Sequence, residues 1–149
     1  MIVSDATTLI VLDSLDRFDL LKVFNTIYIP KNVFEEVSIK AKSKIEFSYE
    51  IIEHKDELYS DLLTILDKGE AEAIALAKAK SLPLIIDEKK GRSVAKRFGL
   101  VYIGFLGLLC KNIRENNISK KEALEVLQKA VGNGFRVSNS LIDEFKRSC

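Results

Sequence analysis

Histidine and cysteine are scarce in this chain. Its 149 residues include one histidine, His54, and two cysteines, Cys110 and Cys149. His54 lies in a polar run typical of a surface loop or a strand end, so the sequence offers almost no residues for a mechanism that depends on histidine. Two cysteines far apart form neither a zinc pattern nor a disulfide framework. We therefore predict that Cys110 is a small buried apolar residue and that the protein works in a reducing cytoplasm.

Long apolar runs are also missing. No stretch approaches the roughly 20 apolar residues of a membrane span. The first residues, MIVSDATTLIVL, have no basic region and carry Asp5 inside a short apolar run, unlike a secretory signal. These features predict a protein that is neither secreted nor embedded in a membrane.

The chain has no excess of charge and none of the common catalytic signatures. Its 23 basic and 22 acidic residues give a net charge of +1, so no bulk electrostatic partner is indicated. A P-loop, GxGxxG after a strand, GxSxG and HExxH are all absent. A substrate that carries phosphate must therefore be held by local contacts or by a metal.

What is present is an alternation of short apolar runs and helix-like segments. A chain of 149 residues with 47% hydrophobic residues fits one domain spanning 1–149. We expect strands at 1–4, 26–29, 50–53, 82–86 and 100–103. We expect helices after Asp5 and at 18–24, 31–42, 57–66, 70–80, 89–98, 104–114 and 120–131, and a last one starting near Ser138. Residues 67–69 are interpreted as a helix end and turn. The alternation predicts an α/β fold with a parallel sheet covered on both faces.

Acidic residues occupy the points where the predicted strands end or helices begin. Asp5 and Asp87 end two strands, Glu70 opens a helix, and Glu36 lies within another. Each has an ordinary alternative: Asp5 as a helix N-cap, Glu70 as a favourable charge at a helix start, Glu36 as a solvent-facing side chain. In parallel sheets, however, sites lie outside the carboxyl ends of the strands. Converging carboxylates tolerate one another only with a cation between them, and oxygen ligands suit Mg²⁺ or Mn²⁺.

Hydroxyl and basic residues follow these acids directly. Thr7 or Thr8 would orient a water or a scissile phosphate, although threonine after a strand is also ordinary. The helix after Asp87 begins with Lys89 and contains Arg92. These two would hold flanking phosphates, whereas the alternative is a solvated helix face.

Four segments together resemble the PIN-domain ribonucleases, and more closely a PIN-like subfamily with a GEAEAIALA signature. They are VSDATTLI, IPKNVFEEV, LDKGEAEAIALAKAKSLPLIIDEKKGRSVAKRFGL and IGFLGLL. The resemblance covers nearly the whole chain. It implies a three-layer α/β/α sandwich with a parallel, roughly five-stranded sheet, a pocket for Mg²⁺ or Mn²⁺, and hydrolysis of single-stranded or loop RNA.

The resemblance also assigns residues and partners. It matches Asp5, Glu36 and Glu70 to the family's acids, with Asp87 ranked first as the fourth acid and Glu88 as the alternative. Thr7 matches the hydroxyl position that follows the first acid. Many PIN proteins are toxins neutralised by a partner antitoxin, and they commonly form dimers, so the resemblance implies an antitoxin partner and a homodimer.

The leading hypothesis is a metal-dependent endoribonuclease in which Asp5, Glu36, Glu70 and Asp87 act through a divalent cation. One alternative is a module that keeps the pocket and binds RNA or protein without turnover. Another is a domain that accepts a phosphoryl group on Asp5 or Asp87. No code for the RNA target is readable in the sequence.

Overall fold

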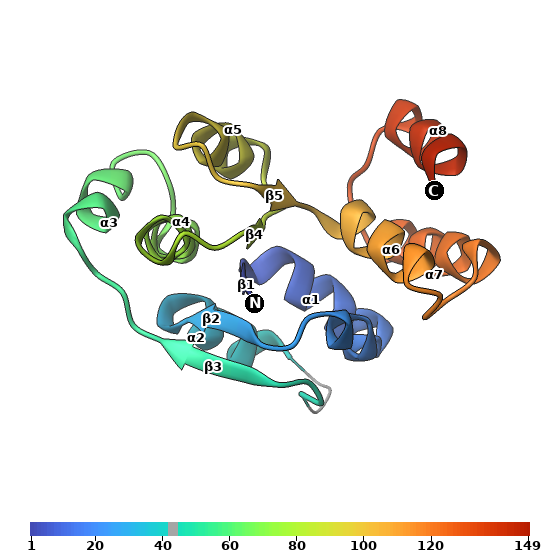
Figure 1. Cartoon of the computed structure of the whole chain (residues 1–149), viewed down its shortest axis with the longest axis horizontal. Helices are drawn as coiled ribbons and strands as arrows, with labels where there is room; N and C mark the ends of the chain where they lie inside the picture. The colour runs from blue at the N-terminus through green and yellow to red at the C-terminus, as the bar shows by residue number, and fades with distance from the viewer. Residues whose placement is uncertain (42–44) are drawn as a thin grey trace.

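A five-stranded, entirely parallel sheet forms the centre of the molecule. The computed structural model describes residues 1–41 and 45–149. In the order β3-β2-β1-β4-β5, the strands pair side by side (Figure 1). Their bounds are β1 Ile2–Ser4, β2 Ile27–Pro30, β3 Tyr49–Ile52, β4 Leu84–Ile85 and β5 Tyr102–Ile103. The sheet confirms the α/β fold class.

Helices connect the strands and cover the sheet. The bounds are α1 Ala6–Leu15, the 3-10 helix η1 Phe18–Val23, α2 Lys31–Lys40, α3 Glu57–Leu62, α4 Lys68–Lys80, α5 Lys89–Arg97, α6 Phe105–Arg114, α7 Lys120–Gly132 and α8 Asn139–Ser148. In Figure 1, α3, α4 and α5 lie together on one side, and α6, α7 and α8 on the other. In the part of the chain described, no helix has the length and apolar character needed to cross a membrane.

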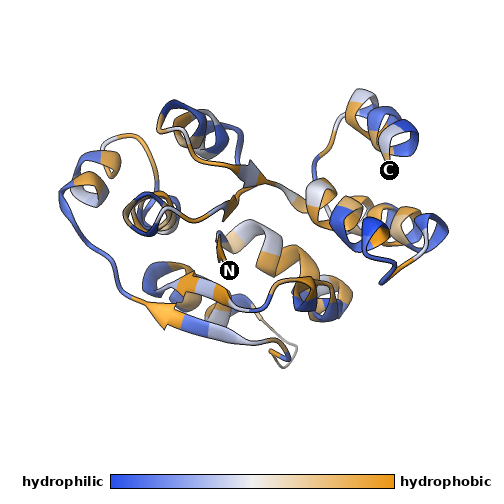
Figure 2. Ribbon diagram, viewed as in Figure 1, coloured by the Kyte–Doolittle hydropathy of each residue, from blue (hydrophilic) through white to orange (hydrophobic). Residues whose placement is uncertain are grey.

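Alternating residues of the strands belong to two hydrophobic cores, one on each face of the sheet. Ile2 and Ile85 belong to a core with α1, η1, α2, α6 and α7, whereas Val3 and Leu84 belong to one with α3, α4 and α5. Successive side chains of a strand point to opposite faces, so strands buried on both sides need continuous apolar runs. Figure 2 shows hydrophobic residues along the central strands. The helices carry both hydrophobic and hydrophilic residues, as expected for helices with one face on the sheet and one in solvent (Figure 2).

Most predicted elements are present, but several ends differ. The helix predicted at 57–66 ends at Leu62, although Leu66 is buried in the turn that follows. The strand predicted at 82–86 is reduced to Leu84–Ile85, and that at 100–103 to Tyr102–Ile103. The helix predicted at 31–42 ends at Lys40, and its predicted end, Lys42, lies outside the described residues. Runs of apolar residues predict which residues are buried. The bounds of a strand or helix depend instead on its backbone hydrogen bonds, which here cover fewer residues than the apolar run.

The interpretation of residues 67–69 as a helix end and turn is wrong. Asp67 is the N-cap of α4, and its Oδ1 accepts a hydrogen bond from the Glu70 amide at 2.8 Å. Gly69 is buried within the first turn of this helix. An acidic N-cap followed three residues later by glutamate is a helix-start signature, and here it outweighs the tendency of glycine to end helices.

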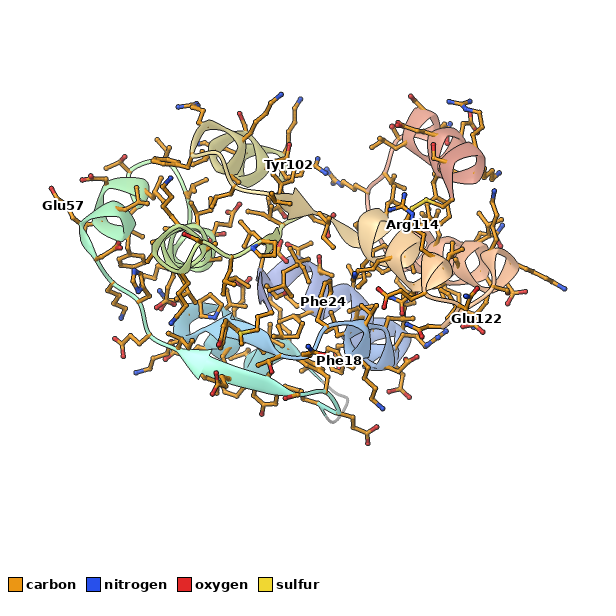
Figure 3. All side chains as sticks on the ribbon, viewed as in Figure 1. Phe18, Phe24, Glu57, Tyr102, Arg114 and Glu122 are labelled. Atoms are coloured by element: carbon orange, nitrogen blue, oxygen red, sulfur yellow. A yellow bond between two sulfur atoms is a disulfide. The ribbon has the colours of Figure 1, made fainter. Side chains whose placement is uncertain are left out.

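The prediction that the cysteines form no disulfide is also wrong. Cys110 on α6 and Cys149, which follows α8, are bonded, with their Cα atoms 5.5 Å apart (Figure 3). That separation is in the usual range for a disulfide. The bond joins the last helix to the body of the molecule, and it removes the argument from cysteine usage for a reducing cytoplasm.

One buried carboxylate, Glu72, joins three elements. It lies on α4, and its two oxygens accept hydrogen bonds from the Asn32 amide at 2.7 Å and the His54 amide at 2.8 Å. Asn32 lies in the first turn of α2, where amides have no partner within the helix, and His54 follows β3. Glu72 therefore fixes the start of α2 and the end of β3 against α4.

Replacing this carboxylate is expected to destabilise the fold. Glu72→Ala leaves two half-buried amides without an acceptor, at a cost of about 2 kcal/mol in the free energy of unfolding. Glu72→Gln keeps one carbonyl oxygen and should lose about half as much. Urea unfolding measures both, with Glu125→Ala on the exposed face of α7 as the control. Equal stability of Glu72→Ala and Glu125→Ala would contradict this role.

Candidate active site

Asp5 lies at the carboxyl end of β1, next to the end of β4. Its side chain is buried, with 2% exposure. Oδ1 accepts a hydrogen bond from the Thr8 amide at 3.2 Å, and Oδ2 accepts one from the Asp87 amide at 2.9 Å. Asp5 is therefore an N-cap of α1, as the ordinary alternative expected, and it also ties the two central strands together at the edge where parallel sheets place their sites.

Asp87 directs its carboxylate towards the start of α6. It accepts hydrogen bonds from the Phe105 amide at 3.0 and 3.1 Å and from the Thr8 hydroxyl. Gly104 lies against it, and a Cβ on Gly104 would collide with Asp87 Oδ1. The absence of a side chain at Gly104 lets Asp87 reach the first amide of α6, so this carboxylate satisfies an amide at a helix start.

The next residue, Glu88, faces the other acids instead. A cavity of about 80 Å³ opens at the carboxyl edge of the sheet. Its lining residues are Asp5, Ala6, Thr7, Glu36, Asp67, Gly69, Glu70 and Glu88. We call this the acidic cavity. The Thr7 hydroxyl donates a hydrogen bond to Glu88 Oε1 at 3.2 Å. The structure thus brings Asp5, Glu36 and Glu70 to one cavity, with Glu88 rather than Asp87 beside them.

Glu70 contains the one buried side-chain polar atom without a hydrogen-bond partner in the described part of the chain, Oε2. It lies in the first turn of α4, behind the Asp67 cap. A Cβ on Gly91 would come within 2.7 Å of this oxygen, so the glycine lets α5 pack closely over it. A buried acceptor without a partner costs free energy and points to an absent cation or donor.

The buried acids in this region hold their protons unusually tightly. Burial, and then the like charge of Asp87, raises the pKa of Asp5 to about 7. Burial, and then the like charges of the neighbouring acids Asp67, Glu88 and Asp5, raise the pKa of Glu70 to about 8. Burial also raises the pKa of Asp87, against the Thr8 and Phe105 hydrogen bonds and the Arg92 charge. Such shifts mark a site where negative charge lacks compensation.

The donor set suits a divalent cation, but the side chains are not gathered around a point. Residues 1–41 and 45–149 contain no group of three or more His, Cys, Asp or Glu side chains that could hold a metal ion as they stand. Glu36 is at the cavity rim, with a side chain 41% exposed, and its ion-pair partner among the residues described is Lys40, 3.6 Å away. Glu88 is exposed as well. The unpaired Glu70 oxygen and a lining in which every charged residue is an acid fit Mg²⁺ or Mn²⁺.

A larger cleft adjoins the acidic cavity and contains the predicted basic residues. Its volume is about 480 Å³, and Thr7 and Glu88 line it as well as the acidic cavity. Lys89 and Arg92 contribute from α5, together with Asp87. The structure therefore places the two predicted phosphate-binding residues beside the acids, on the other side of Glu88.

Sequence reasoning missed three residues of this region: Asp67, Phe135 and Arg136. Asp67 lines the acidic cavity, and the Asp-Lys-Gly-Glu order of 67–70 was a signal that could have found it. Phe135 and Arg136 line the cleft from the segment between α7 and α8. Nothing in the local sequence links them to a site almost fifty residues earlier in the chain.

Comparison with known families agrees with this geometry. A family model described as DUF3368, a PIN domain, matches residues 1–149. No curated protein matches the chain. The match spans every element that contributes to the acidic cavity, and the parallel sheet with helices on both faces is the architecture of a PIN-like sandwich. The chain belongs to the PIN-domain family.

Proposed function

We propose that this protein is an endoribonuclease that depends on a divalent metal and hydrolyses RNA phosphodiester bonds at the acidic cavity. The observation that carries the proposal is the unpaired, buried Oε2 of Glu70, a residue that lines a cavity in which every charged lining residue is an acid. PIN domains are generally nuclease-like and typically use divalent metals, and this chain belongs to them.

Asp5, Glu70 and Glu36 would hold the cation, with Glu88 or Asp87 as the fourth acid. When bound, a divalent cation supplies Lewis-acid chemistry and neutralises charge on the phosphodiester. The choice of the fourth acid stays a prediction: Glu88 lines the cavity, whereas Asp87 is engaged by the Phe105 amide. Rotation of Asp87 would cost that hydrogen bond, so we favour Glu88.

The other residues of the site would position the reactants. Asp5 holds α1 against β4, so the Thr7 hydroxyl lies at a set place on the cavity rim. Thr7 already donates to Glu88, and would orient a water or a phosphate oxygen in the same direction. Lys89 and Arg92 would hold the phosphates that flank the scissile bond. Chemistry of this kind needs no protein nucleophile, so the single histidine is not required.

Cleavage of a panel of short labelled RNAs tests the proposal. With Mg²⁺ or Mn²⁺ the native chain should cleave, and chelator or Asp5→Asn should abolish cleavage, because Asp5 would no longer supply an anionic ligand. Asp61→Asn, an exposed acid on α3, is the matched control and should cleave like the native chain. Circular dichroism should show the fold of Asp5→Asn intact.

Other results of the cleavage assay would lead to different conclusions. Full cleavage by Asp5→Asn would exclude the acidic cavity as the active site. Binding of metal and RNA without any cleavage would favour a module that has lost turnover. The toxin role, the antitoxin partner, the homodimer and the cytoplasmic location implied earlier stay predictions.

A further inference from the structure

The cleft beside the acidic cavity continues past Phe135 into a second hollow. The first hollow is about 480 Å³ and the second about 470 Å³. Both are lined by Asp87, Arg92, Phe135 and Arg136, so they are two parts of one groove. We call it the C-terminal groove, because residues 133–138, between α7 and α8, form one wall. The opposite walls come from α1 and the start of α5.

Three basic side chains border this groove without forming an ion pair in the part of the chain described. Lys89, Arg92 and Arg136 make no ion pair or hydrogen bond with any residue that the structure describes. Arg92 is near enough to Asp87 for its charge to lower the pKa of that acid. Elsewhere, bases such as Arg17 and Lys111 are paired with acids. Unpaired cations beside an acidic cavity favour an anion that extends along the groove.

An aromatic ring is fixed in the same wall. Phe135 packs edge-on against the buried Phe105, with ring centroids 5.1 Å apart. Only part of Phe135 is covered, and it lines both hollows. Gly134, with a φ of 103°, turns the linker just before it. That backbone conformation is costly for other residues, so the glycine allows Phe135 and Arg136 to follow α7 in this direction.

We propose that the C-terminal groove binds a single strand of nucleic acid, with a backbone phosphate at Arg136 and a base against Phe135, and so leads the strand to the acidic cavity. Cations along a groove with a rigid aromatic face are the chemistry of single-strand binding, since a base is free to stack only when it is unpaired. The proposal rests on the proposed function, and it assigns the C-terminal linker a direct role in substrate binding.

Binding without metal separates this proposal from the cleavage reaction. A fluorescein-labelled, mixed-sequence RNA of about 12 nucleotides, in chelator, gives the affinity by anisotropy at several salt concentrations. Arg136→Gln should weaken binding about 5–10-fold and reduce the slope of log K against log salt by about 0.7, the value for one phosphate contact on a single strand. Arg114→Gln is the matched control, because Arg114 is also an exposed, unpaired arginine but lies at the far end of α6 (Figure 3).

A second variant tests the same wall by adding a negative charge instead of removing a positive one. Asn133 lines the groove and is exposed, so Asn133→Asp should keep the fold and add a charge that repels phosphate. It should weaken binding by a similar factor. A duplex of the same sequence should bind less tightly than the single strand to the native chain.

The outcomes are distinct. Native binding that falls in Arg136→Gln and Asn133→Asp but not in Arg114→Gln supports the groove. Equal affinity of all four proteins, or no binding in chelator, overturns it. Because Asp5→Asn should still bind RNA in chelator, a failed cleavage assay with intact groove binding would reject the proposed function alone.

Discussion

In chelator, the protein is expected to lose stability as the pH rises from about 4 to about 8. Folding raises the pKa of Asp5 from 3.8 to about 7 and that of Glu70 from 4.5 to about 8. Between the ordinary and raised values the folded state binds more protons than the unfolded state, so stability falls with rising pH. The contribution is fully present below about pH 4 and is lost as the pH passes through the folded values.

Asp5 is expected to lower the free energy of unfolding by on the order of 4 kcal/mol over this pH range. Its pKa is raised by about three units, and each unit corresponds to roughly 1.4 kcal/mol. Glu70 acts in the same direction. Urea unfolding at pH 5 and pH 8.5, in chelator, measures the change. Manganese should restore stability mainly at the higher pH, because the cation competes with protons for the same carboxylates.

Asp5→Asn provides the internal comparison. The amide does not ionise, so the stability of the variant should depend less on pH than that of the native chain. Groups far from Asp5 titrate in both proteins and cancel in the difference, whereas Glu70, whose pKa the Asp5 charge helps to raise, adds to the difference in the same direction. Identical pH dependence of the two proteins would show that Asp5 ionises as an ordinary surface acid.

Reduction of the disulfide is expected to cost about 4 kcal/mol. Cys110 and Cys149 are 39 residues apart in sequence. Cross-linking a chain over such a length removes conformational entropy from the unfolded state worth about 4 kcal/mol, between the values for 15- and 100-residue loops. The tether also matters in the folded state, because Phe145 is the only buried residue of α8 in the structure as described, and a further contact is the Lys120 ammonium on the Lys146 carbonyl.

Urea unfolding with and without a reducing agent tests this bond. With a slope near 2 kcal/mol/M, the midpoint should fall by about 2 M on reduction. Cys149→Ser should match the reduced native chain, and reducing agent should not change it further. Two reactive thiols in the protein denatured without reducing agent would show that the bond does not form. Equal unfolding midpoints with and without reducing agent would show the same.

The positions of the candidate acids illustrate what local sequence can predict. Asp5 and Asp87 follow apolar runs that had to be strands, and carboxyl ends of parallel strands share one edge. The order of strands and helices therefore predicts, without any knowledge of tertiary contacts, that these two acids lie in one region. The sequence could not tell that Glu88 lines the acidic cavity whereas Asp87 accepts a hydrogen bond from the Phe105 amide, because that contact joins residues 18 positions apart.

By itself, the sequence determined the alternation of apolar strands and amphipathic helices, and hence a parallel sheet with acids at its carboxyl edge. These properties follow from local periodicity and from the direction of the chain. Only the tertiary structure decided which groups meet: the unpaired Glu70 oxygen under Gly91, the link between Cys110 and Cys149, and Arg136 and Arg92 in one groove. Such contacts join segments far apart in sequence, and packing of whole elements sets them, so no local pattern contains them.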